Sequence, residues 1–146
     1  LLGLLPHVAT KCARFKGKDM SVFLDRKDYT GDLFTQLEQV EAFVRSLDGI
    51  FILAHVDKSR DSVISQLGFI PFDLKPDSLE ISARCDHAQL LQTHKYLSKY
   101  RFIRSSDAHY QEDFLSSGCT FHIRELTFSE VAMALRGQEG RFVSLD

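Results

Sequence analysis

The clearest hydrophobic pattern in the chain has the spacing of an α-helix and covers residues 33–47. Apolar residues recur there three or four positions apart, which places them on one helix face. They are Leu33, Leu37, Val40, Val44 and Leu47. Asp32 is a suitable N-cap for this helix, and Gly49 stands where the helix would end. The pattern therefore predicts an amphipathic helix whose apolar face is turned to a core.

Short runs of apolar residues elsewhere in the chain predict buried strands. The run at 50–56 is nearly all apolar and directly follows the predicted helix, which is typical of an interior strand of a parallel sheet. The predicted strands are residues 1–5, 50–56, 79–82, 102–106, 120–123 and 141–145. Residues 8–29 have no clear period, and we expect them to be irregular or partly helical.

Three shorter helices are predicted between these strands. They cover residues 61–67, 86–97 and 127–136. Asp86 is suited to cap the second of them, while Thr127 and Glu130 form a capping-box pattern at the start of the third. The alternation of helices and strands predicts an α/β fold with mostly parallel strands, in a single domain over residues 1–146.

Composition narrows the class of protein. Of the 146 residues, 44% are hydrophobic, and 12 phenylalanines help to fill a core, which excludes a mainly disordered chain. No apolar run approaches the roughly 20 residues of a membrane-spanning helix, so we expect no membrane partner. The net charge of −2 gives no general attraction to nucleic acid. The widely spaced cysteines Cys12, Cys85 and Cys119 do not suggest a disulfide framework, which favours a cytoplasmic location.

Side chains with metal-binding chemistry occur in or after three successive predicted strands. His55 ends the first of these strands, Glu80 lies in the second, and Asp107 and His109 follow the third. The carboxyl ends of parallel strands meet at one edge of a sheet, and in extended backbone Asp107 and His109 project to the same side. Imidazole together with carboxylate suits Zn²⁺, Mn²⁺ or Fe²⁺. The alternative is that Asp107 and His109 are ordinary turn and cap residues.

The same residues resemble the motifs of a known family. The segment SSDAH at residues 105–109 resembles Ser-Asp-x-His, the last motif of the PHP (polymerase and histidinol phosphatase) superfamily. Residues 54–57 and 64–71 resemble a subgroup of PHP-type phosphoesterases, and residues 79–81 match the strand that follows in that subgroup. The ordered combination of these motifs is more specific than the last motif alone.

The resemblance implies a partial, distorted (β/α)7 barrel of TIM-like form. It also implies hydrolysis of phosphate monoesters or diesters with two or three divalent metal ions, for which Zn²⁺, Mn²⁺, Fe²⁺ and Mg²⁺ are candidates. By motif, the metal ligands would be His55, Asp107 and His109. Glu80 matches a strand position that lines the site, where it would support the ligands rather than bind metal.

Two further residues are candidates for contact with substrate. Arg84 follows the strand at 79–82, where its guanidinium group would hold a phosphate through paired hydrogen bonds. A surface ion pair is an equally good interpretation of Arg84. Ser106 belongs to the last motif, and we expect it to contact the substrate or support a ligand. Cys85 lies at the same edge, and we expect it to be an inert, buried thiol rather than a metal ligand.

The earlier motifs of the family have no counterpart in this sequence. These are its opening His-x-His motif, its Asp-His motif and its bridging Glu, so the chain resembles the carboxyl-terminal part of a PHP domain. The resemblance assigns His55, Asp107 and His109 to different ions, which leaves each ion with about one ligand, whereas a catalytic Zn²⁺ normally has about three. We therefore expect this stretch of chain, on its own, to bind metal weakly and to hydrolyse little.

The leading hypothesis is thus a metal-dependent phosphoesterase that acts on a small phosphorylated substrate, with nucleic-acid ends also compatible. The alternative is a PHP-derived module that has lost catalysis and serves binding or assembly. A third interpretation, amidohydrolase-type cleavage of a C–N bond, is disfavoured by the SDAH-type ending. Because a partial barrel exposes strand edges, we also expect self-association through those edges.

Overall fold

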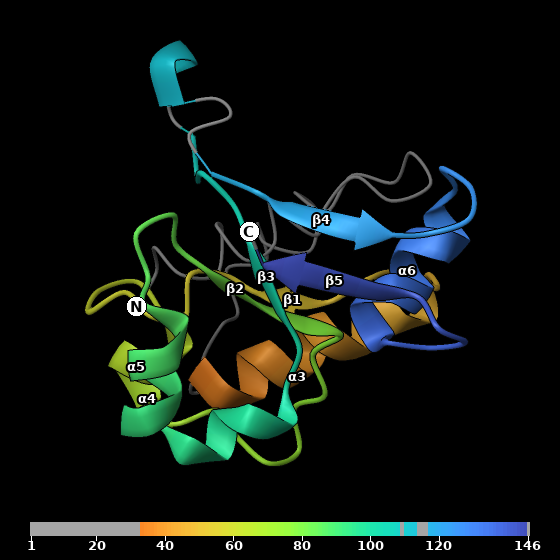
Figure 1. The fold of residues 1–146 in the computed structure, drawn as a ribbon. Coiled ribbons are helices and arrows are strands. Elements are labelled where there is room, and N and C mark those ends of the chain that lie inside the picture. The colour runs from red at the N-terminus through yellow and green to blue at the C-terminus, as the bar shows by residue number, and fades with distance from the viewer. Residues whose placement is uncertain (1–32, 109, 114–116, 146) are drawn as a thin grey trace.

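The computed structural model describes residues 33–108, 110–113 and 117–145, in which helices and strands alternate (Figure 1). The strand predicted at 1–5, the segment 8–29 and the Asp32 cap lie outside the described residues. The elements are α3 (Leu33–Ser46), β1 (Ile52–Leu53), α4 (Val63–Leu67), β2 (Ser78–Ile81), α5 (His87–Thr93), the 3₁₀-helix η1 (Lys95–Lys99), β3 (Phe102–Arg104), the 3₁₀-helix η2 (Gln111–Asp113), β4 (Cys119–His122), α6 (Phe128–Arg136) and β5 (Phe142–Leu145). No described helix has the length and apolar character needed to cross a membrane.

The first three strands form a parallel sheet in the order β1-β2-β3. Leu79 of β2 pairs with Leu53 on one side and with Phe102 on the other. All four residues of β2 are buried, as expected for a central strand that is covered on both faces. The prediction of parallel pairing is confirmed for this part of the chain, although the described strands do not close into a barrel.

The last two strands form a separate antiparallel ladder, so the described strands are parallel only in part. Cys119 pairs with Leu145, and His122 pairs with Phe142. Figure 1 shows the reason, because α6 lies at the end of the ladder where β4 finishes and β5 begins. The helix therefore does not carry the chain back along the sheet, as a parallel crossover requires. Instead, β5 starts beside the end of β4 and runs in the opposite direction.

Two of the shorter helices differ from their prediction in ways that local hydrogen bonds explain. The helix predicted from Asp61 begins two residues later, because Ser62 is its cap and forms a reciprocal capping box with Ser65. The helix predicted over 86–97 does begin after its Asp86 cap but is interrupted at His94, where α5 gives way to η1. The tighter turn of η1 brings Leu97 fully into the core.

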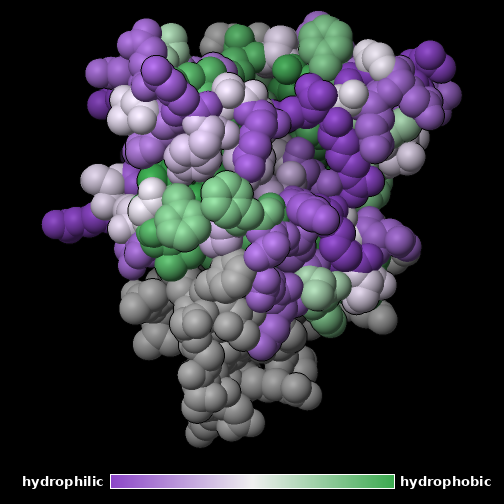
Figure 2. Space-filling model, turned by 90° about the horizontal axis from the view of Figure 1, so that it is seen from below, coloured by the Kyte–Doolittle hydropathy of each residue, from purple (hydrophilic) through white to green (hydrophobic). Residues whose placement is uncertain are grey.

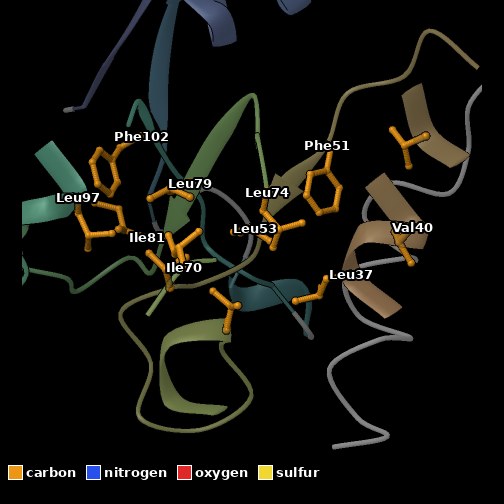
Figure 3. Close-up of a cluster of buried hydrophobic side chains, with 13 residues drawn as sticks. Leu37, Val40, Phe51, Leu53, Ile70, Leu74, Leu79, Ile81, Leu97 and Phe102 are labelled. Atoms are coloured by element: carbon orange, nitrogen blue, oxygen red, sulfur yellow. The ribbon is translucent and has the colours of Figure 1, made fainter. Parts of the chain in front are cut away.

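The core lies between α3, the parallel strands and the loop that precedes β2 (Figure 3). Leu37 and Val40 supply the apolar stripe of α3, which confirms that its hydrophobic face is turned inward. The other fully buried large apolar side chains are Phe51, Leu53, Val56, Ile70, Leu74, Leu79, Ile81 and Leu97. This core holds the parallel strands in register and so fixes the positions of the residues that follow them.

A buried carboxylate joins the two parts of the structure. Asp77, just before β2, accepts a hydrogen bond from the backbone N–H of Phe51 at 2.7 Å. The same carboxylate forms ion pairs with Arg45 of α3 and Arg136 of α6, each at 2.7 Å. Because Arg136 comes from the element between β4 and β5, Asp77 links the antiparallel ladder to the parallel sheet.

The loop between α4 and β2 exposes two aromatic rings. Phe69 and Phe72 have ring centroids 6.5 Å apart, and the Lys99 ammonium group lies 5.2 Å from the Phe72 centroid. Figure 2, which views the molecule from below, shows hydrophobic residues among hydrophilic ones on this side. The loop belongs to the end of the molecule opposite the residues discussed next (Figure 1).

Candidate functional site

Two candidate residues lie where the backbone leaves the parallel strands in an unusual conformation. His55 follows β1 with a φ angle of 31°, and Asp107 follows β3 with a φ angle of 50°. Positive φ is uncommon for residues other than glycine, and it persists only where the surrounding structure holds it. His55 is also buried, with 3% of its surface exposed. Both residues therefore sit in conformations that the neighbouring strands impose.

Glu80 of β2 connects the ends of the three parallel strands. Its side chain is buried, and the residue is 4% exposed. The carboxylate accepts a hydrogen bond from the backbone N–H of His55 at 3.1 Å and another from the hydroxyl group of Ser105. Glu80 thus links His55, which follows β1, to Ser105, which follows β3.

Asp107 forms an ion pair that the sequence did not reveal. Its Oδ2 atom lies 2.8 Å from Nζ of Lys58, which belongs to the loop after β1. The Asp107 side chain is 10% exposed and the Lys58 side chain 42% exposed. Lys58 has no recognisable motif, and only the folded chain places it opposite Asp107. The ion pair thus joins the segment that follows β1 to the segment that follows β3.

A second carboxylate supports the loop after β2. Asp57 accepts hydrogen bonds from both the backbone N–H of Ser82, at 2.8 Å, and the Ser82 hydroxyl group. Burial, with the nearby charge of Asp57 adding to it, raises the pKa of the Cys85 thiol to about 11. A thiol with so high a pKa is protonated at neutral pH. Cys85 is half-buried rather than buried, and its assignment as an inert thiol rather than a ligand stays a prediction.

The two candidates for substrate contact differ in their exposure. Arg84 is exposed in the loop after β2, and Ser106 is half-buried after β3. A different arginine organises this loop, since Arg104 donates to the carbonyl oxygens of Ala83 at 2.9 Å and Cys85 at 3.1 Å. The roles predicted for Arg84 and Ser106 stay predictions.

The described residues do not by themselves complete a metal site. Across 33–108, 110–113 and 117–145, no three His, Cys, Asp or Glu side chains come together in a group that could hold an ion. His55 and Asp107 lie at the same edge of the sheet, and His109 lies outside the described residues. The assignment of His55, Asp107 and His109 as ligands stays a prediction.

The fold resembles solved structures of endonuclease Q. One is the lesion-specific endonuclease from Pyrococcus furiosus, with a TM-score of 0.61 and 23% identity. Another is endonuclease Q in complex with a 27-mer duplex that carries an abasic lesion at the active site, with a TM-score of 0.63 and 22% identity. Each likeness covers 73% of this chain but 28% of the solved chain, so this chain spans little more than a quarter of those proteins.

At this level of identity the likenesses concern the fold alone, and they agree with the α/β fold that the sequence predicts. No protein-family model matches the sequence, and no curated protein matches it.

Proposed function

We propose that the carboxyl edge of the parallel sheet is part of a PHP-type site that hydrolyses phosphate monoesters or diesters with bound divalent metal ions. The observation that carries the proposal is that His55, Glu80 and Asp107 each lie in or directly after one of three neighbouring parallel strands, at the same edge of the sheet. Their arrangement occurs in a fold that is similar to endonuclease Q. Enzymes of the parallel α/β class place their functional groups beyond the carboxyl ends of strands.

Each residue has a distinct part in this proposal. Asp107 supplies a negative charge, and His55 supplies an imidazole on a backbone whose N–H donates a hydrogen bond to Glu80. Divalent ions, when bound, polarise phosphoryl oxygens and lower the pKa of a coordinated water. Their ligand set would include residues outside the described part, with His109 among them. We expect a small phosphorylated substrate, with a nucleic-acid phosphodiester as the alternative substrate.

One observation favours the competing hypothesis of a non-catalytic binding module. The Asp107 carboxylate is paired with Lys58 in the described structure, and a lysine that permanently neutralises this carboxylate would weaken its attraction for a metal ion. The two hypotheses differ in whether divalent ions produce turnover.

The test is hydrolysis of an aryl phosphate monoester and diester by the full-length protein, with Mn²⁺, Zn²⁺, Fe²⁺ or Mg²⁺ added after chelation. We expect activity that depends on metal and falls about 100-fold or more in Asp107→Asn, in line with the loss of a group that acts on the transition state. Asp73→Asn, in the exposed loop before β2, is the matched control and should retain full activity. Metal-independent turnover, or equal activity of the two variants, would contradict the proposal, and no turnover with any ion would favour the binding module.

A further inference from the structure

We propose that Lys58 binds the phosphate group of the substrate at the carboxyl edge of the sheet, an inference that rests on the proposed function and deepens it. The Lys58 ammonium group lies 2.8 Å from the Asp107 carboxylate and thus stands between the loops that follow β1 and β3. It is the cation that the described structure places directly against a candidate ligand of the site.

The backbone of Lys58 is fixed on both sides. Its N–H donates to the carbonyl oxygen of His55 at 3.0 Å, and its carbonyl oxygen accepts from the Ser62 hydroxyl group at 2.7 Å. Ser62 is fully buried and also caps α4. The backbone of Lys58 is therefore anchored to the segments at β1 and α4. Because the backbone is already ordered, binding a ligand costs less conformational entropy.

The ion pair itself has little value as a structural feature. The Lys58 side chain is 42% exposed, and ion pairs with such access to water contribute little to stability. An ammonium group has three donors, so one can remain with Asp107 while the other two reach an anionic oxygen. Lysine binds phosphate as a compact point charge, without the planar geometry that arginine needs. These properties suit Lys58, whose side chain is 42% exposed, to bind an anionic oxygen that approaches from solvent.

The exposed Arg84 is less suited to this role. It belongs to the loop after β2, whereas the Lys58 ammonium group lies 2.8 Å from the Asp107 carboxylate. The assignment therefore moves the phosphate-binding role from the arginine that the sequence suggested to a lysine that only the structure brings to the site.

The probe for this inference is inorganic phosphate, whose binding to the full-length protein in the presence of Mn²⁺ is measured by calorimetry. We expect Lys58→Gln to raise the Kd for phosphate about tenfold or more, because it removes a charged hydrogen bond. Lys58→Arg should recover part of the affinity. Arg60→Gln is the matched control, since it removes the same charge from the same exposed loop, and it should change the Kd less than about twofold. Thermal unfolding of each variant, together with KM and kcat for an aryl phosphate, separates binding from folding, and we expect Lys58→Gln to raise KM more than it lowers kcat.

Four results would overturn the assignment. The first is an unchanged phosphate Kd in Lys58→Gln, and the second is an equal weakening in Arg60→Gln, which would indicate general attraction by surface charge. The third is a Lys58→Gln variant that binds Mn²⁺ more tightly than wild type and loses no affinity for phosphate. That result would indicate that the Lys58 ammonium group occupies the place of a metal ion beside Asp107. Wild-type protein that binds no phosphate also overturns it, whereas intact, Lys58-dependent phosphate binding without turnover would count against the proposed hydrolysis alone.

Discussion

At the scale of single residues, the candidate site contains a buried carboxylate with a structural role. Glu80 accepts hydrogen bonds from the backbone of His55 and from the hydroxyl group of Ser105. A buried donor that loses its acceptor costs more free energy than the hydrogen bond contributes when it is made. Glu80 therefore stabilises the backbone around His55 while leaving the imidazole to the site.

Replacing Glu80 tests this role through stability. We expect Glu80→Ala to lower the free energy of unfolding by about 2–4 kcal/mol, because it leaves a cavity and two unpaired donors. Glu80→Gln keeps the shape and one acceptor oxygen, so its cost should be about 1 kcal/mol. Urea unfolding measures both, with the exposed Glu125→Ala as a control that should change stability by less than about 0.5 kcal/mol. A loss in Glu80→Ala no larger than that of the exposed control would contradict this role of Glu80.

The sequence indicated candidate site residues but not how their backbone and side chains are held. His55, Glu80 and Asp107 could be placed at one sheet edge because each occurs in or directly after a predicted strand. The Lys58–Asp107 pair joins residues far apart in sequence, so no local pattern could reveal it. The positive φ angles of His55 and Asp107 were equally hidden, since neither residue is a glycine or lies in a recognised turn motif.

At the scale of elements, the helix ends show how tertiary contacts change a local motif. Thr127 caps α6 by accepting from the Glu130 N–H at 3.3 Å, as its capping-box pattern predicts. The Glu130 side chain does not complete the box, because it accepts from the Arg124 N–H at 2.9 Å and from the Arg141 guanidinium group at 2.7 Å. A charged partner from the turn just before β5 thus takes the place of the local partner within the helix, and the sequence of the helix could not show this.

This ion pair predicts a specific loss of stability in acid. Hydrogen bonds from Arg141 and the Arg124 N–H lower the pKa of Glu130 from 4.5 to about 2. Since the folded pKa lies below the unfolded one, the contribution of the pair is complete above pH 4.5 and is lost as the pH falls towards 2. We expect the stability difference between wild type and Glu130→Gln, measured by urea unfolding, to be constant at neutral pH and to shrink below pH 4.5. Glu139→Gln, which removes an exposed carboxylate that also contacts Arg141, should show a smaller effect, and a pH-independent difference for Glu130→Gln would contradict the prediction.

At the scale of the whole molecule, the parallel sheet and the antiparallel ladder are two units joined by the buried charges around Asp77. The alternation of helices and strands was enough to predict the α/β class and the parallel sheet. It could not predict the direction of β5, because that depends on where α6 packs rather than on its sequence pattern. Self-association through sheet edges stays a prediction, and its test is light scattering of the protein over micromolar concentrations.

The central claim is that the carboxyl edge of the parallel sheet contributes to a metal-dependent phosphoesterase site. Elemental analysis of the full-length protein, purified without added chelator, tests it most directly. We predict about two or three divalent ions per chain, and the loss of at least about one ion in Asp107→Asn and in His109→Ala. A full-length protein that holds no divalent ion, or that keeps its full complement in both variants, would contradict the claim.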